Sequence, residues 1–222
     1  MRWLAFLLFA LVLVSACAPA VPPLVLPQDC PRDHELGSLQ EKQWLQQKAV
    51  WRLHQTMLLE TRFRKLAMQG FLRLDLKTGQ GRLVAMNEVG LVLFDLTFTA
   101  DDTEVHRVIP PLQKRPQMLA TVGRNLRRIF LLAAASSDAE PTDIGSHRVL
   151  TRTVDDITRT GLFDCRGDLR ESRTRGKDTN WRVLYNRYAE HEKWRLPQEI
   201  ILNDQRDNIR LSLEVHEVKL EP

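Results

Sequence analysis

The chain has 222 residues, of which 43% are hydrophobic, and its 32 basic and 28 acidic residues give a formal net charge of +4. Because the positive residues are dispersed among carboxylates, this mild excess excludes a basic nucleic-acid-binding surface. The sequence has no internal repeat of fixed period and, outside a proline-rich leader, no low-complexity tract. Residues 38–222 are numerous enough to form one domain with a substantial core.

Residues 1–16 have the three parts of a secretory signal peptide. Arg2 supplies a positive charge, an apolar run extends from Trp3 to Val14, and the small residues Ser15 and Ala16 follow. The apolar run is too short to span a bilayer comfortably as a permanent helix. We therefore predict that residues 1–16 are a signal peptide and that the protein is exported.

The residues Val14-Ser15-Ala16-Cys17 resemble the lipobox of bacterial lipoproteins. The resemblance implies cleavage before Cys17, a diacylglycerol on its thiol and a further acyl chain on its amine. One acyl chain binds a membrane only marginally, whereas two or three anchor a protein stably. The alternative is an ordinary secreted protein in which this cysteine is a coincidence. Since Ala18 replaces the aspartate that favours inner-membrane retention in enterobacteria, the resemblance implies an outer-membrane lipoprotein that faces the periplasm.

Residues 17–37 form a leader in which five prolines lie between Ala18 and Pro31. Because proline fixes φ and donates no backbone hydrogen bond, we expect an extended, semi-rigid spacer. The alternative is a leader packed along the domain through its apolar residues. With Cys17 lipidated, Cys30 and Cys165 remain, and in an oxidising compartment they either form one disulfide or stay unpaired.

The domain is predicted to begin with a short helix from Ser38 to about Gln47, since Ser38-Leu39-Gln40-Glu41 matches a capping box. Apolar residues at period two then indicate half-buried strands joined by short turns, which is typical of an antiparallel meander. The strands expected in this meander cover residues 65–76, 82–86, 91–99 and 104–109. One face of the third strand carries Val92, Phe94, Leu96 and Phe98.

Pro110-Pro111 ends the meander, and an amphipathic helix is predicted after it. Its apolar residues recur at helical spacing from Met118 to Phe130, with arginines and an asparagine between them. A polar loop is expected over residues 136–147. The chain then returns to strands, which are expected at residues 169–175, 181–188, 198–202 and 209–218.

These elements predict a mostly β (α+β) fold, an incomplete and strongly curved antiparallel β half-barrel with a helical lid. A strongly twisted antiparallel sheet curls toward a barrel, and a helix over its open side can leave an apolar space between helix and sheet. Composition leaves open whether side chains fill that space or whether it can hold an acyl chain. The candidate cavity-lining residues are Leu72, Leu74, Val92, Phe94, Leu96, Leu126 and Phe130.

The order of these elements resembles the LolA/LolB superfamily of periplasmic lipoprotein carriers and receptors, and two stretches carry the likeness. Asn87-Glu88-Val89-Gly90 resembles the Asn-Pro-Leu-Gly loop of LolB-type receptors. Residues 180–185, followed by 196–204 and 209–211, resemble the closing strands of the family. The sequence is also similar to the LolB-like lipoproteins catalogued as DUF3261. On this resemblance, residues 38–222 are a single LolB-like lipid-binding domain.

The resemblance implies a function in lipoprotein or lipid localisation. The domain would bind the acyl chains of membrane lipids or lipoproteins, and a periplasmic LolA-like carrier would be its partner. Val89 would insert into the membrane, although valine is smaller than the leucine of the family and the charge of Glu88 opposes insertion. The alternative for Val89 is an ordinary hairpin residue. We expect a monomer that uses no cofactor and binds no nucleic acid.

The sequence carries no enzyme signature, so we expect a binding protein and not an enzyme. No two histidines have the i, i+4 spacing of a zinc site, and none adjoins a cysteine pair, so no metal site is expected. The basic residues between Arg166 and Lys177 either meet lipid phosphates or an acidic carrier, or they form a solvated edge. Two other functions stay open: a structural or scaffolding envelope lipoprotein with a filled core, and an enzyme whose site the sequence does not reveal.

Overall fold

The structure is a computed structural model that describes residue 24 and residues 43–133, 138–145, 147–191 and 194–221. The predicted signal peptide, Cys17, Cys30, most of the leader and the capping box at Ser38 lie outside the described residues. The described part of the predicted N-terminal helix is a 3-10 helix, η1 (Trp44–Gln46). No helix within the described ranges is both long enough and apolar enough to cross a membrane.

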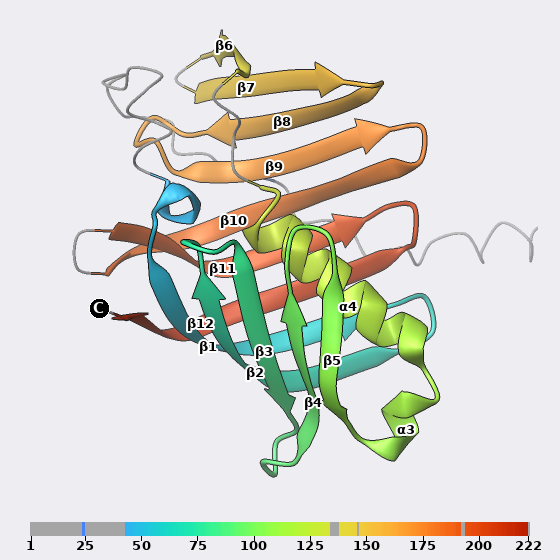
Figure 1. Ribbon diagram of the computed structural model, residues 1–222. Helices are drawn as coiled ribbons and strands as arrows, with labels where there is room; N and C mark the ends of the chain where they lie inside the picture. Colours follow the sequence, from blue (N-terminus) through green and yellow to red (C-terminus); the bar gives the residue numbers. More distant parts are fainter. Residues whose placement is uncertain (1–23, 25–42, 134–137, 146, 192–193, 222) are drawn as a thin grey trace, which may run out of the picture.

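The described strands form one antiparallel sheet of 12 strands (Figure 1). The strands of the first half are β1 (Val50–Glu60), β2 (Lys65–Asp75), β3 (Gln80–Met86), β4 (Val92–Phe98) and β5 (Thr103–Val108). Those of the second half are β6 (Glu140–Ile144), β7 (His147–Val154), β8 (Ile157–Phe163), β9 (Leu169–Gly176), β10 (Thr179–His191), β11 (Trp194–Asp204) and β12 (Ile209–Glu221). Each strand is joined to the next by hairpin pairing within its half, which confirms the predicted meander.

The first and last strands pair with each other in the middle of the sheet. The order across the sheet is β5-β4-β3-β2-β1-β12-β11-β10-β9-β8-β7-β6. The β1–β12 ladder runs from the pair Val50 and Glu221 to the pair Glu60 and Arg210. The two outer edges are therefore β5 and β6, which follow each other in the chain.

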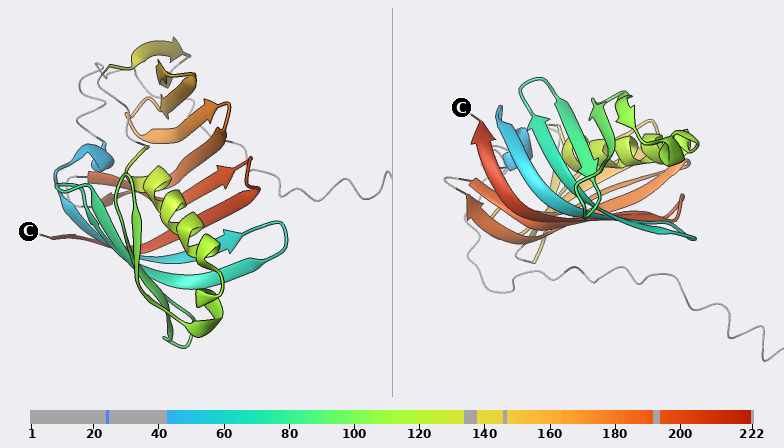
Figure 2. Two further views of the ribbon diagram at one scale, coloured as in Figure 1. Left: turned by 45° about the vertical axis from the view of Figure 1, so that its right-hand side comes forward. Right: turned by 90° about the horizontal axis from the view of Figure 1, so that it is seen from below.

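Two helices connect these edges, α3 (Pro110–Gln113) and α4 (Pro116–Phe130). The sheet curves around α4, which contacts β4 and β5 on one side and β11 on the other (Figure 2). Since β5 and β6 do not pair, the sheet stays open and α4 covers the opening. The predicted half-barrel with a helical lid is confirmed, and so is the predicted amphipathic helix.

Sequence reasoning missed four strands. It assigned nothing to β1, whose inward row of apolar residues at period two is interrupted by the polar Gln55. It also predicted a loop over residues 136–147, where β6 and the start of β7 lie, and it missed β8. β6 is a fully exposed edge strand containing Pro141, and β7 is mostly half-buried, so neither shows the alternation of a half-buried strand.

A second correction concerns β4. Phe94, Leu96 and Phe98 are buried as predicted, but Val92 is only half-buried and Leu93 is buried in its place. The register shifts between β3 and β4, where Ala85 faces Phe94 and Met86 faces Val92. Leu93 is thus an extra residue in a β-bulge, which changes the face that each side chain takes.

The helix α4 lies very close to strand β5 at Gly123. A Cβ atom on Gly123 would be 2.2 Å from Oγ1 and 2.8 Å from Cβ of Thr103. Only a residue without a side chain fits this distance, which explains a glycine here although it weakens a helix by about 1 kcal/mol relative to alanine.

We therefore expect Gly123→Ala to destabilise the protein by about 1–3 kcal/mol through overpacking, in spite of its better helix propensity. The measurement is the free energy of unfolding in urea. Thr121→Ala on the same helix is the control, because it raises helix propensity at a half-buried position and should change stability by a few tenths of a kcal/mol at most. A gain in stability for Gly123→Ala would show that the helix is not seated on Thr103.

Candidate functional site

The predicted cavity-lining residues meet between the sheet and α4. Six of the seven, all but Val92, belong to one apolar cluster and are between 0 and 2% exposed; they are Leu72, Leu74, Phe94, Leu96, Leu126 and Phe130. Such low exposure means that these side chains are closely packed against their neighbours. The site predicted from the sequence is therefore assembled, but it is closed in this structure.

The lid is fastened to the second half of the sheet by three polar contacts, which we call the lid clasp. The hydroxyl of Tyr185 in β10 donates a hydrogen bond of 2.8 Å to the carbonyl oxygen of Ile129, in the last turn of α4. Arg128 forms an ion pair of 2.5 Å with Asp204 at the end of β11. Arg124 forms one of 2.6 Å with Asp207 in the following turn.

Two of these contacts are shielded from solvent. Tyr185 is fully buried, and burial raises the pKa of its hydroxyl well above 10, so it stays a hydrogen-bond donor. The side chains of Arg128 and Asp204 are 12% and 2% exposed, and desolvation lowers the pKa of the guanidinium although Asp204 opposes this shift. Arg128 also lies over the ring of Trp181, 5.4 Å from its centroid. The clasp thus depends chiefly on Tyr185 and Arg128.

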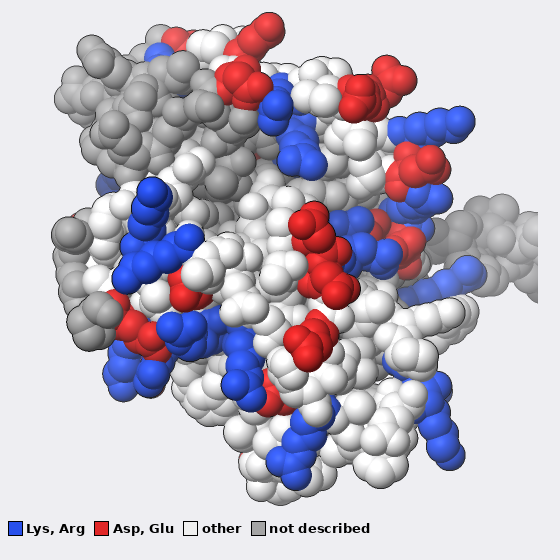
Figure 3. Space-filling view, viewed as in Figure 1, with Lys and Arg blue, Asp and Glu red and all other residues white. Residues whose placement is uncertain are grey.

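The remaining clasp pair lies on an exposed surface of mixed charge. Arg124 and Asp207 are 41% and 36% exposed. Basic and acidic side chains are interspersed over the face of the molecule seen in Figure 3. Exposed pairs of this kind contribute little to stability, with a typical value of about 0–1 kcal/mol.

A polar side chain, Gln55, lies on the apolar inner face of the sheet. It is 0% exposed, and within the described residues neither its oxygen nor its nitrogen has a hydrogen-bond partner. Trp51 Nε1, two inward positions back along β1, is equally unpartnered among the described residues. A buried polar group without a partner costs about 1–3 kcal/mol, so Gln55 destabilises the closed state.

On the β2 side, the positions beside Gln55 carry small residues. Gln55 pairs with Gly70 across β1 and β2, and Gly70 pairs with Ala85 across β2 and β3. The space over Gly70 is taken by flexible atoms, since Met57 Sδ lies 2.6 Å and Leu83 Cδ1 3.1 Å from the place of a Cβ. Methionine is unbranched and adapts readily, so this space can change its occupant with little rearrangement of the backbone.

The loop between β3 and β4 displays Val89, the predicted membrane-insertion residue. Val89 is 86% exposed. The side-chain oxygen of Asn87 accepts hydrogen bonds from the backbone nitrogens of Val89, at 3.1 Å, and Leu91, at 2.8 Å, which fixes the loop. The β1–β2 turn lies at the same end of the strands and carries Phe63, which is 84% exposed and which sequence reasoning did not single out.

Cys165 lies in a buried turn between β8 and β9. It is 5% exposed and disulfide-bonded. Because Cys17 and Cys30 lie outside the described residues, its pairing with Cys30 stays a prediction. The neighbouring Asp164 accepts hydrogen bonds from the backbone nitrogens of Arg166 and Asp168, and burial raises its pKa. These contacts order the turn.

The histidines and the basic residues between Arg166 and Lys177 take part in local contacts. His54, His106 and His216 bond to Gln69, Thr97 and Thr56 on the outer face of the sheet. In the basic stretch, Arg170 and Arg173 pair with Asp164 and Glu171. Among the residues that the structure describes, no group of three or more histidine, cysteine or acidic side chains could hold a metal ion.

Comparisons with known proteins find a distant structural likeness. No protein-family model matches the sequence, and a search of curated proteins finds no significant match. A LolA superfamily protein from Nitrosomonas europaea is 10% identical and superimposes with a TM-score of 0.48, over 84% of this chain and 93% of that one. A candidate outer membrane lipoprotein-sorting protein domain from Vibrio parahaemolyticus is 6% identical, with a TM-score of 0.47 over 83% and 90% of the two chains.

A DUF1329 family protein from Desulfovibrio piger is 10% identical and has a TM-score of 0.37, over 80% of this chain and 88% of that one. The first of the three proteins belongs to the superfamily that the sequence motifs resemble. Identities and TM-scores at this level assign neither a family nor a function to the chain. The similarity to DUF3261 proteins is not confirmed.

The shielded ion pair of Arg128 should contribute far more to the stability of the protein than the exposed pair of Arg124. We expect Arg128→Met to lower the free energy of unfolding by about 3–5 kcal/mol, because it leaves the buried carboxylate of Asp204 without its cation. Arg124→Met, the matched control, should lower it by less than about 1 kcal/mol. Urea unfolding followed by tryptophan fluorescence measures both values. Equal losses for the two variants would show that Arg128 does not hold the lid.

Proposed function

We propose that the protein is an outer-membrane lipoprotein, anchored through Cys17, whose domain binds acyl chains between α4 and the inner face of the sheet. It would receive lipids or lipoproteins, take up one of their acyl chains, and pass it on to the membrane. A periplasmic LolA-like protein is the partner that the motifs imply. The lipobox-like residues before Cys17 and the apolar inner face support this proposal.

The observation that carries the proposal is the unpartnered amide of Gln55 beside the small residues Gly70 and Ala85. An acyl chain that displaced Met57 from the space over Gly70 would bring its ester or amide group within reach of Gln55. The side-chain NH₂ of Gln55 would donate to the carbonyl oxygen of that group. Binding would then supply the hydrogen bond that the closed state lacks and recover part of its cost.

Entry of a chain requires the lid to move. The clasp joins only the C-terminal half of α4 to the sheet, and its two shielded contacts involve Tyr185 and Arg128. Release of the lid would expose the apolar faces of both helix and sheet, which an acyl chain would cover again at about 0.8 kcal/mol per buried methylene. Each methylene that it buries would offset part of the apolar contact that the lid gives up.

Gln55→Leu separates ligand binding from folding. We expect it to raise the free energy of unfolding by about 1–3 kcal/mol, because an apolar side chain of similar size removes the buried unpartnered amide. The same variant should capture less lipid. Capture is measured on the full chain in lipid nanodiscs that contain a phospholipid with a photoactivatable acyl chain. Cross-linked residues are identified by mass spectrometry.

In the wild-type chain, cross-links are expected on inner-face residues such as Met57 and Leu83. Gln69→Leu is the control, since it removes the same amide from the outer face of β2. It should leave these cross-links unchanged. A loss of stability in Gln55→Leu, or cross-links confined to exposed residues, would contradict acyl binding at this site.

The closed packing of the predicted lining residues favours one other function, a structural or scaffolding envelope lipoprotein with a filled core. In that case the inner face would take no cross-link in any variant. Cross-links to the envelope proteins that it holds together would appear instead, and added fatty acids would not compete with them.

Val89 is proposed to contact the membrane during release of the acyl chain. Val89→Asp should slow the transfer of photoactivatable or fluorescent lipid from the protein to vesicles several-fold, because burying a charge in lipid is unfavourable. Ile144→Asp is the control, since Ile144 is 60% exposed but lies at the opposite end of the strands, in the β6–β7 turn. Equal transfer rates for the two variants would show that Val89 is an ordinary hairpin residue.

A further inference from the structure

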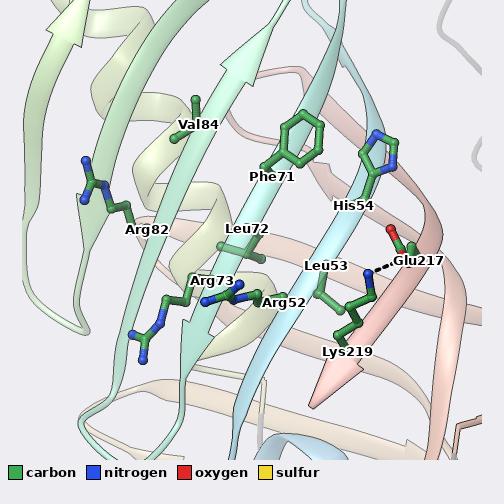
Figure 4. Close-up of a pocket in the computed structure, with 10 residues that line it drawn as sticks. All are labelled: Arg52, Leu53, His54, Phe71, Leu72, Arg73, Arg82, Val84, Glu217 and Lys219. Atoms are coloured by element: carbon green, nitrogen blue, oxygen red, sulfur yellow. Dashed lines mark ion pairs between the residues drawn. The ribbon is translucent and has the colours of Figure 1, made fainter. Parts of the chain in front are cut away.

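The outer face of the sheet, on the side away from α4, contains a hollow of about 390 Å³ (Figure 4). Its walls come from four neighbouring strands, β12, β1, β2 and β3. The volume is at the lower end of the range for pockets that hold small molecules, which is about 300–1,000 Å³. It suits a headgroup with a short apolar part and is too small for a whole lipid.

Four cations stand in a row across this hollow. Lys219 is directly opposite Arg52, Arg52 is opposite Arg73, and Arg73 is opposite Arg82. Directly opposite side chains on neighbouring strands have Cβ atoms about 4.5–5.5 Å apart, and like charges at such positions are destabilising. Local rules of sheet stability therefore oppose this arrangement, and residues that break such rules are concentrated at functional sites.

Four carboxylates at the sides of the row pair with its four cations. Glu221 pairs with both Arg52 and Arg73, Asp75 lies 3.6 Å from Arg73, and Asp95 holds Arg82 at 2.8 Å. Glu217 lies 2.7 Å from Lys219. The cations nevertheless stay open to solvent, with side chains that are 47 to 67% exposed. Each guanidinium has five N–H donors, so one or two carboxylates leave further donors for another oxyanion.

A second row, of two apolar side chains and an imidazole, lies beside the cations, two residues along each strand. It consists of His54, Phe71 and Val84, which are opposite one another on β1, β2 and β3. The ring of Phe71 is stacked on that of His54, with centroids 4.5 Å apart and an interplanar angle of 4°. A hydrogen bond of 2.8 Å between His54 Nε2 and Gln69 Oε1 holds the imidazole in place. Phe71 is 44% exposed, which is unusual for a large apolar residue in the middle of a strand.

We propose that this hollow binds a phosphate monoester that carries an apolar group, such as the headgroup end of an anionic lipid. The phosphate lies on the row of Arg52, Arg73 and Arg82, and the apolar group lies on Phe71 and Val84. A phosphate monoester carries about −1.5 to −2 charges at pH 7 and three acceptor oxygens, so it can contact neighbouring guanidiniums in the row. This site is separate from the inner face, and the proposal stands whether or not the domain binds acyl chains between sheet and lid.

The test is a calorimetric titration of the full chain in phosphatidylcholine nanodiscs. The probes are dihexanoyl phosphatidic acid, which has both parts, dihexanoyl phosphatidylcholine, whose phosphate is a diester, and inorganic phosphate, which has no apolar part. We expect the phosphatidic acid to bind at least tenfold more tightly than either of the others. Equal affinity for inorganic phosphate would overturn the apolar half of the proposal, and equal affinity for the phosphatidylcholine would overturn the anionic half.

Variants then locate the site. Arg73→Gln should weaken binding of the phosphatidic acid about tenfold or more, and Phe71→Ser should weaken it while leaving the weak binding of inorganic phosphate unchanged. Arg159→Gln is the matched control, because it removes an exposed strand arginine from β8, outside the hollow. None of the three should lower the melting temperature of the wild-type chain. Equal effects of Arg73→Gln and Arg159→Gln would overturn the proposal.

Gln55→Leu separates this site from the inner face. It should leave the titration with phosphatidic acid unchanged even where acyl cross-linking is lost. A loss of both in Gln55→Leu would mean that one site, and not two, binds lipid.

Discussion

The pairing of the first strand with the last strand sets the architecture of this protein. Because β1 and β12 meet in the middle of the sheet, the outer edges are two strands that are consecutive in the chain, β5 and β6. The chain between them has to cross from one edge to the other, and it does so as α4 over the apolar inner face. An antiparallel sheet with one apolar face requires such a cover. The lid is thus a consequence of the strand order and of the need to bury that face.

The inner face has to meet two opposing requirements, a well-packed core and a place for a ligand. A stable closed domain needs every inward position to be apolar and well packed, and most of them are. Gln55 departs from this pattern together with Gly70 and Ala85 beside it, and the departure lies where Met57 can move aside. Binding sites commonly sacrifice stability in this way, because a group that is satisfied only by a ligand is unsatisfied without it. The row of cations on the outer face is a second such departure, on the opposite side of the same strands.

The sequence allowed much of the fold to be predicted, and the physical reason differs from element to element. The strands β2 to β4 and β9 to β12 and the helix α4 have clear periodic burial, since each has one apolar face. The strand β6 could not be recognised because both of its faces are exposed, and β7 and β8 could not because few of their residues are buried. The bulge at Leu93 depends on how β3 and β4 pair, which period two alone does not encode. Six of the seven predicted lining residues are buried in one cluster, and their role in binding stays a prediction. The burial of Gln55 was missed because a polar residue in a strand is ordinarily taken to face solvent. The cation row could not be found either, since its four members are separated in the chain and only the register of three strand pairs brings them together.

The central claim is that the lid moves to admit an acyl chain. Spin labels at two exposed positions, Ala120 on α4 and Glu214 on β12, would report the distance between lid and sheet in the full chain. Electron–electron double resonance should give one distance without lipid and a longer one when a phospholipid with long acyl chains is added. The dihexanoyl lipid, which is too short to replace the contacts of the lid, should leave the distance unchanged. An identical distance distribution at saturating concentrations of long-chain lipid would contradict the account.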